Sequence, residues 1–219
     1  MDLAPVLDVD GGQGPDNQDP DGTRSFSTDE KTASADGLAF AAGLQAGGVV
    51  PVVKHFPGLG GATGNTDVTP ASTPPWSTLE RVGLVPFENA FDAKLPAVMV
   101  ANATIPGLTK LPASISPVVL SGLLRDRLGF QGLVMTDALS AVALSAIGYT
   151  VPKAAVAALE AGADMVVFDA DPGVVASLTN RIVSAVVSAV GAGKLGLARL
   201  VSAVTHILKV KHVDVCAAS

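Results

Sequence analysis

The stretch that decides the fold is residues 51–70, "PVVKHFPGLGGATGNTDVTP". It begins as an apolar strand, passes directly into Lys54 and His55, and continues as a loop of glycines, threonines and one acid. A loop this small and polar cannot supply a hydrophobic core. We therefore expect it to be shaped for binding or catalysis at the end of a buried strand.

The composition indicates one α/β domain. The 219 residues are enough for a sizeable core. The hydrophobic content of 48% comes mainly from Ala, Val and Leu, and aromatic residues make up only 4%, which favours helices and strands over a β-sandwich. The net charge of −6 is spread along the chain without a Lys/Arg cluster, so we expect no nucleic-acid or anionic-membrane partner.

Cysteine usage and the apolar runs point to a soluble chain. Cys216 is the single cysteine, has no metal-ligand spacing around it and is interpreted as an incidental thiol. The first ten residues contain acids where a signal peptide needs a basic segment. No apolar run is long enough to span a bilayer. The localisation stays open.

Five short runs are nearly continuous in apolar residues, as is typical of parallel strands buried on both faces. They are residues 3–9, 48–56, 96–103, 132–139 and 163–168. Helical patterns lie between or after them, at residues 32–46, from Ser77, from Ser116-Pro117 towards Gly129, from Pro152 to Gly162, and at 174–190 and 197–210. Ser77 and Glu80 form a capping-box pattern, and Pro86 predicts a kink or two shorter helices. Strands alternating with helices predict a parallel sheet.

Polar residues follow each of these runs. They are Asp8 and Asp10, Lys54 and His55, Asn102 and Thr104, Thr136 and Asp137, and Asp169 and Asp171. A single acid in such a position is usually a helix cap or a turn former. The full set on one edge of a parallel sheet predicts a functional site. Residues 10–23 form a long segment without a helix or strand pattern, which in a compact domain is usually functional.

These residues together resemble a known family. The segment "KHFPGLGGATGNTD" (54–67), "LAPVLDVD" and "RSFSTD" before it, and "LPAVMVANATIPGL" and "LGFQGLVMTDAL" after it are similar to the barrel domain of glycoside hydrolase family 3. The similarity covers roughly residues 2–210 and is greatest to bacterial β-N-acetylhexosaminidases. It implies a TIM-type (β/α)₈ barrel, with the five runs matching its last five strands. Residues 1–219 are accordingly predicted to be a single, N-terminally truncated barrel domain, either a gene remnant or a chain whose start is assigned too late.

The resemblance also implies a mechanism and its residues. Asp137, at the end of "GLVMTD", matches the nucleophile of a retaining glycosidase, although capping of the next helix is the alternative. Lys54 and His55 match a pair that binds sugar hydroxyls. Arg24 matches a substrate-binding arginine, with a surface ion pair as the alternative, and Asn102 is predicted to bind substrate as well. No metal or organic cofactor is implied.

The loop departs from the family pattern at its acid/base. In the hexosaminidases the loop after "KHFPG" carries Asp-Ser-His, and the histidine is the general acid/base. Here the aligned residues are Asn65, Thr66 and Asp67. Asp67 is predicted to serve as a carboxylic acid/base in place of the histidine, and the alternative is that it only caps a turn. Gly58, Gly60, Gly61 and Gly64 are expected to leave the loop free to close over a sugar.

The predicted function is a retaining β-glycosidase that releases terminal β-linked N-acetylglucosamine, or glucose, from oligosaccharides or cell-wall glycans. The alternative is a catalytically inactive remnant that binds sugar weakly, because five strands leave two open sheet edges. A third interpretation is a phosphate-binding barrel enzyme. Asp169 and Asp171 after the last strand argue against it, since they would repel a phosphate. The oligomeric state is left open.

Overall fold

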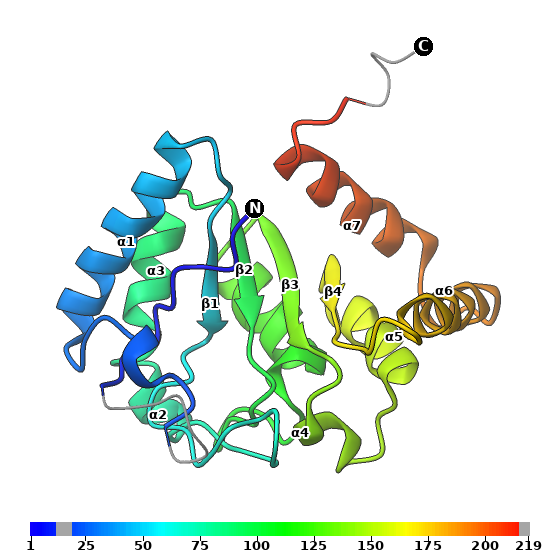
Figure 1. Ribbon diagram of the computed structural model, residues 1–219, viewed down its shortest axis with the longest axis horizontal. Coiled ribbons are helices and arrows are strands. Elements are labelled where there is room, and N and C mark those ends of the chain that lie inside the picture. The colour runs from blue at the N-terminus through cyan, green and yellow to red at the C-terminus, as the bar shows by residue number, and fades with distance from the viewer. Residues whose placement is uncertain (12–18, 215–219) are drawn as a thin grey trace.

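The structure is a computed structural model that describes residues 1–11 and 19–214. Its centre is a parallel sheet of four strands in the order β1 (Val52–Phe56), β2 (Ala97–Val100), β3 (Leu133–Ala138) and β4 (Met165–Val167). Because neighbouring strands are parallel, their carboxyl ends all lie at one edge, where the arrowheads point in Figure 1. The predicted α/β class with a parallel sheet is confirmed.

Helices flank this sheet. They are α1 (Glu30–Ala46), α2 (Trp76–Leu79), α3 (Val85–Asp92), a π-helix (Val118–Arg127), α4 (Val142–Ser145), α5 (Val151–Ala161), α6 (Val175–Gly191) and α7 (Leu197–Val210), with 3₁₀ turns at Gly22–Arg24 and Ala113–Ile115. Helices α1 and α3 pack together beside β1, and α5 and α6 lie beyond β4 (Figure 1). In the part of the chain that the structure describes, no helix is both long and apolar enough to cross a membrane.

The two faces of the sheet bury different sets of side chains. Val53, Val98 and Val134 face the main core with the aromatic residues of α3. Their sequence neighbours Val52, Ala97 and Leu133 face the opposite side, together with Met99 and Met135, where Ile207 and Val210 of α7 cover them. This two-residue alternation with apolar residues on both faces explains the nearly continuous apolar runs in the sequence.

The first apolar run, residues 3–9, does not form a strand of its own. It runs parallel to β1 through isolated bridges, Asp2 to Pro51 and Val6 to Lys54. The run includes Pro5, which has no backbone N–H to donate, although its carbonyl accepts from the Lys54 N–H at 3.1 Å. The expectation of five strands was therefore wrong, because the described residues form four. Residues 3–9 lie where a fifth strand would lie but pair with β1 only through isolated bridges.

Two predicted helix starts were also wrong. Helix α2 begins at Trp76 rather than Ser77, with Pro75 before it, and no side chain caps it. The helix after Pro117 is a π-helix without a side-chain cap, and the Ser116 hydroxyl instead contacts the Thr109 hydroxyl at 3.0 Å. The prediction that Pro86 splits the second helix is confirmed, because Pro86 lies in the first turn of the separate helix α3.

The other helix predictions agree with the structure to within two residues. Helix α5 starts beside Pro152 and ends before Gly162, whose φ of 126° only glycine adopts readily. Of the predicted functional segment 10–23, residues 12–18 lie outside the described residues.

Candidate active site

A cavity of about 220 Å³ lies at the carboxyl edge of the sheet. Five of the six predicted site residues line it: Arg24, Lys54, His55, Asp67 and Asp137. They come from the 3₁₀ turn, the end of β1, the loop after β1 and the end of β3. Parallel pairing places the ends of β1 and β3 at the same edge of the sheet, and the 3₁₀ turn and the loop after β1 add Arg24 and Asp67 there.

A larger cavity of about 740 Å³ lies at the opposite, amino edge of the sheet. Pro51, Pro96 and Leu133 at the strand starts line it, and α7 contributes His206 and Lys209. None of the predicted catalytic residues is in its lining. The site is therefore assigned to the smaller cavity, where the titratable groups converge.

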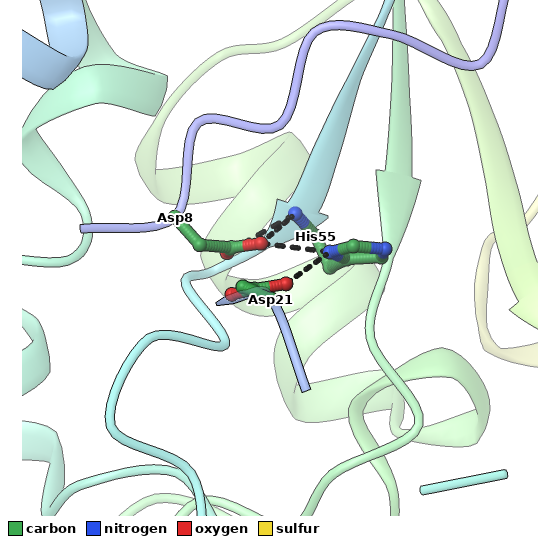
Figure 2. Close-up of side chains that lie close together, drawn as sticks. All are labelled: Asp8, Asp21 and His55. Carbon is green, nitrogen blue, oxygen red and sulfur yellow. Dashed lines mark hydrogen bonds and ion pairs between the residues drawn. The ribbon is translucent and has the colours of Figure 1, made fainter. Parts of the chain in front are cut away.

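Lys54 and His55 occupy successive positions on β1 and play different structural roles. The peptide bond between them is cis. His55 is buried, and its Nδ1 lies 2.7 Å from Asp8 Oδ2 (Figure 2). Because Nδ1 faces a carboxylate, it carries the ring hydrogen and donates a hydrogen bond to Asp8. Nε2 is then the ring atom available to a ligand. Burial and the nearby Arg24 lower the pKa of Lys54, while the charge of Asp137 opposes that shift.

Asp8 is a fully buried carboxylate held by hydrogen-bond donors. Its oxygens accept from the His55 N–H at 3.1 Å and from the Leu59 N–H at 2.6 Å. Burial acts to raise the pKa of Asp8, but His55 and these donors outweigh it and hold that pKa below its usual value. The carboxylate thus fixes both the imidazole and the start of the following loop.

Asp21 lies beside the same histidine. Its Oδ1 is 3.6 Å from His55 Nδ1, and its side chain is fully buried. Burial and the neighbouring Asp8 raise the pKa of Asp21 to about 10, so Asp21 is a neutral carboxylic acid at physiological pH. Sequence reasoning missed this residue. No strand or motif precedes Asp21 to signal its burial, and its segment "DNQDPDG" (16–22) reads as a polar loop.

A single ligand atom from each of Asp8, Asp21 and His55 lies within 4.8 Å of the other two, a spacing that could hold a metal ion. These three side chains are better arranged to share a proton than to bind a metal ion. Asp8 already accepts three hydrogen bonds from protein groups, and His55 Nδ1 is directed at Asp8. A cation there would have to displace these contacts.

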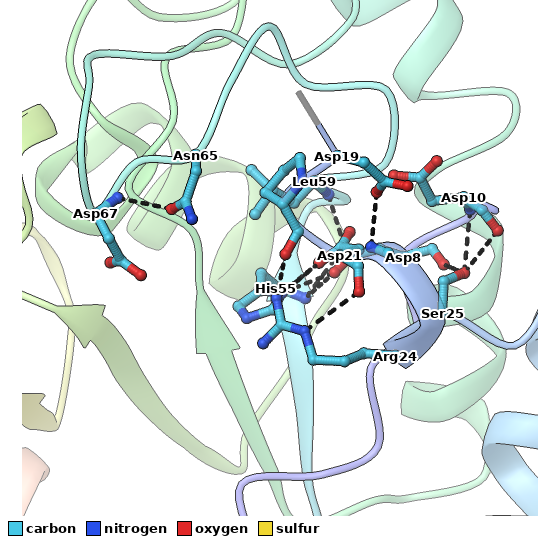
Figure 3. Close-up of polar contacts among 12 residues, drawn as sticks. Asp8, Asp10, Asp19, Asp21, Arg24, Ser25, His55, Leu59, Asn65 and Asp67 are labelled. Atoms are coloured by element: carbon cyan, nitrogen blue, oxygen red, sulfur yellow. Dashed lines mark hydrogen bonds and ion pairs between the residues drawn. The ribbon is translucent and has the colours of Figure 1, made fainter. Parts of the chain in front are cut away.

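Arg24 is joined to this buried cluster through Asp21. Its guanidinium Nη2 lies 3.4 Å from Asp21 Oδ1 and donates to the Pro20 carbonyl at 2.6 Å, and its Nε donates to the Asp21 carbonyl at 3.3 Å (Figure 3). The Arg24 side chain remains 41% exposed, so part of the guanidinium is free to meet a ligand in the cavity. The alternative of a plain surface ion pair does not describe it, because its acid partner is buried.

Asp137 ends β3 and is half-buried at the cavity wall. Its Oδ1 accepts the N–H of Ala138 at 2.8 Å. No side-chain cap is recorded for the nearest helix, α4, whose first residue is Val142. The helix-cap alternative for Asp137 therefore has no contact in its favour, and the second carboxylate oxygen is directed to no hydrogen-bond donor among the described residues.

The loop after β1 contacts two other segments of the chain. A Cβ on Gly60 would lie 2.2 Å from the Val9 carbonyl oxygen, so this glycine permits close contact between two backbone segments. At the far end of the loop, the Thr66 carbonyl accepts the N–H of Ala143 in α4 at 3.0 Å. At Gly60 the glycine therefore serves packing, and closure of the loop over a sugar stays a prediction.

Asp67 presents its carboxylate to the cavity from this loop. The side chain that closes the local turn belongs to Asn65, whose Oδ1 accepts the Asp67 N–H at 2.9 Å (Figure 3). Partial desolvation raises the pKa of Asp67, and the negative charges of Asp137 and Asp169 raise it further. A raised pKa is the direction that a carboxylic general acid requires.

Asn102 is the predicted site residue that the cavity does not include. It is buried, its amide donates to the Ala138 carbonyl at 2.8 Å, and its carbonyl accepts from the Ser114 hydroxyl at 2.6 Å. The first bond ties the end of β2 to the end of β3, beside Asp137, and the second ties it to the 3₁₀ turn Ala113–Ile115. A contact between Asn102 and a sugar remains a prediction.

Comparison with known proteins identifies the class to which this fold and site belong. The model of the glycosyl hydrolase family 3 N terminal domain matches residues 1–210. The chain therefore belongs to glycoside hydrolase family 3, and its open parallel sheet is part of that family's TIM-type barrel domain.

Particular relatives are hexosaminidases. The chain is 39% identical over 171 residues to a protein named Beta-hexosaminidase LpqI of Mycobacterium tuberculosis, covering 75% of this chain and 43% of that protein. It is 33% identical over 204 residues to a Beta-hexosaminidase of Xylella fastidiosa, covering 90% and 58%. The chain thus spans about half the length of the curated relatives it matches.

Solved structures agree. A glycoside hydrolase family 3 beta-N-acetylglucosaminidase from Paenibacillus superposes with a TM-score of 0.88 at 32% identity, covering 96% of this chain and 39% of that one. The structure of LpqI from Mycobacterium tuberculosis gives a TM-score of 0.84 at 33% identity, covering 95% and 60%.

Proposed function

We propose that the chain carries the catalytic pocket of a retaining β-N-acetylglucosaminidase. The observation that carries the proposal is the convergence of Arg24, Lys54, His55, Asp67 and Asp137 on one cavity. Two carboxylates and three potential sugar-binding donors are the groups that glycoside hydrolysis needs. The names of the relatives favour N-acetylglucosamine as the sugar.

Each residue has a definite role in this proposal. The Asp137 carboxylate attacks the anomeric carbon, and the bond to the leaving oxygen breaks as Asp67 donates its proton to that oxygen. The glycosyl-enzyme ester then breaks when water attacks the same carbon, with Asp67 taking the proton from the water. Arg24, Lys54 and His55 hold the sugar hydroxyls, and neither step needs a metal or a redox cofactor.

Sugar binding without turnover is the second candidate. β4 pairs only with β3 among the described strands, and Val167 at its end lines the cavity. Among the described residues no strand pairs with the far side of β4, so these residues by themselves would contact a sugar from fewer sides.

Incubation with nitrophenyl β-N-acetylglucosaminide, with release of nitrophenolate as the readout, tests the first candidate. A slow fluorinated N-acetylglucosaminide should label Asp137 covalently, and mass spectrometry of the digested protein should locate the label. Saturable binding of N-acetylglucosamine without release or labelling selects the second candidate. No release, no label and no binding overturns both.

A further inference from the structure

We propose that Asp21 is a positioning residue of this pocket: its buried carboxyl group orients Arg24 directly, and orients His55 indirectly by leaving Asp8 as the anion that faces the imidazole. The inference rests on the proposed function in so far as Arg24 and His55 are taken as sugar-binding. Asp21 itself is not among the cavity-lining residues, so it acts through its neighbours.

The geometry links one acid to two ligand-facing groups. Asp21 Oδ1 lies 3.4 Å from Arg24 Nη2 and 3.6 Å from His55 Nδ1. The backbone carbonyl of Asp21 accepts a second bond from Arg24, at 3.3 Å from Nε. One short turn therefore holds the guanidinium at two points, while Asp8 and Asp21 both face Nδ1 of the imidazole (Figure 2).

Asp21 performs this role as a neutral acid. Ionisation of both adjacent carboxyl groups is unfavourable, because burial removes the solvation of the second charge and Asp8 repels it more than Arg24 stabilises it. Asp8 receives N–H donors, whereas no donor among the described residues reaches the buried Asp21 Oδ2. The proton therefore belongs on Asp21, whose pKa the neighbouring Asp8 raises.

Neutrality has a consequence for the pocket. If Asp21 were ionised, it would compete with Asp8 for the Nδ1 proton of His55 and pull the Arg24 guanidinium into a closed ion pair. As a neutral acid it accepts from Arg24 weakly and leaves Asp8 as the single anion that orients the imidazole. Arg24 then keeps donors for a sugar.

The test uses the whole chain with Asp21→Asn, Asp21→Leu and Asp21→Ala, and with Asp36→Asn on the exposed face of α1 as the matched control. Asparagine keeps a neutral group that can both donate and accept, whereas leucine and alanine can do neither. Infrared spectra at neutral pH should show a carboxylic-acid carbonyl band in the wild type and in Asp36→Asn that is missing from Asp21→Asn. If the wild type shows no such band, the inference is overturned.

Orientation is read from nitrogen NMR signals of the His55 ring and the Arg24 guanidinium. Asp21→Asn should keep both signals, and Asp21→Leu or Asp21→Ala, whichever folds, should broaden or shift them.

The dissociation constant for N-acetylglucosamine should stay within about twofold for the asparagine variant and rise about tenfold for the apolar variants. Apolar variants with unchanged signals overturn the inference. A wild type that binds no sugar contradicts the proposed function alone, because the band and the signals are measured without ligand.

Discussion

The backbone N–H of Asp67 donates to Asn65 Oδ1 at 2.9 Å, so the side chain of Asn65 closes the turn, which was the alternative role for Asp67. The carboxylate of Asp67 makes no hydrogen bond or ion pair with any described residue, and it faces the cavity that Asp137 also lines. Asn65 therefore stabilises the backbone of the turn, and the Asp67 carboxylate lines the pocket.

Replacement of Asp137 by asparagine should lower the turnover of N-acetylglucosaminides by about three orders of magnitude or more, because an amide cannot form the glycosyl ester. The thermal unfolding midpoint should change little, since the bond from the Ala138 N–H can be kept by the amide oxygen. Turnover and unfolding are measured on the same preparation. Asp169→Asn, at the end of β4, is the control, and a loss of turnover as large as that of Asp137→Asn would remove the distinction between the two acids.

Asp164 should contribute strongly to stability. This buried acid accepts from Arg125 at 2.7 Å and from the Val134 N–H at 3.0 Å, contacts Arg199, and lies 3.0 Å from His206 Nδ1. Asp164→Ala leaves Arg125 and Arg199 without their partner and should cost about 3–5 kcal/mol in the free energy of unfolding by urea.

The control for this prediction is the exposed ion pair between Glu80 and Arg127. Glu80→Gln should cost less than about 1 kcal/mol, because solvent screens such a pair. Equal losses in Asp164→Ala and Glu80→Gln would contradict the assignment of Asp164 as the centre of a buried network.

The sequence was informative where one local signal had one structural cause. Apolar runs predicted β1 to β4 because both faces of the sheet are buried, and Pro152 with Gly162 bounded α5. It failed where a residue's role depends on distant partners. Nothing in the sequence around Asp164 or Asp21 marks either acid as buried. Only the fold brings arginines to Asp164 and a second buried acid, Asp8, to Asp21. The Ser77 capping box failed because the helix begins one residue earlier, at Trp76, whose N–H donates to the distant Pro106 carbonyl at 2.8 Å.

Two glycines allow a matched test of backbone packing. A Cβ at Gly60 would lie 2.2 Å from the Val9 carbonyl, whereas a Cβ at Gly43 in α1 would meet nothing within 4 Å. Gly60→Ala should lower the free energy of unfolding by about 1–3 kcal/mol and weaken sugar binding. Gly43→Ala should raise it by about 0.5–1 kcal/mol through the helix preference of alanine. A neutral Gly60→Ala would favour the interpretation of a mobile loop.

Stability should fall as the pH rises above about 4, because Asp21 keeps its proton in the folded state up to a pKa of about 10, while in the unfolded chain it loses it near 3.8. Between these values the unfolded chain binds fewer protons, so the slope is negative, at most about 1.4 kcal/mol per pH unit for one group. Asp21→Asn should flatten this slope between pH 5 and 9.

The groups that face Asp21 are Asp8, Asp10, Arg24 and His55. Asp8, with a lowered pKa, contributes a positive slope only below about pH 4, outside this window. Urea titrations at several pH values measure the slope in the wild type, in Asp21→Asn and in the control Asp36→Asn. An unchanged slope in Asp21→Asn would mean that Asp21 is ionised in the folded state.

Asp67 is predicted to be the acid/base, and the test depends on the leaving group. Asp67→Ala should lower turnover of substrates with poor leaving groups by about two to four orders of magnitude, because they need a proton as they depart. Nitrophenolate needs little protonation, so formation of the glycosyl-enzyme from an activated substrate should be largely spared. Azide requires no general base, fits the vacancy left by the carboxylate, and should restore breakdown of the intermediate as a glycosyl azide.

The control for this prediction is Asn65→Ala, which removes the bond that closes the turn and leaves the carboxylate in place. If the loop acts only through its shape, Asn65→Ala and Asp67→Ala should lose activity equally on both leaving-group classes, and azide should rescue neither. If Asp67 transfers the proton, only Asp67→Ala separates the two classes. The charge of Asp137 raises the pKa of Asp67. The Asp67 carboxyl group should therefore titrate at lower pH in Asp137→Asn than in the wild type, as measured by carboxyl NMR.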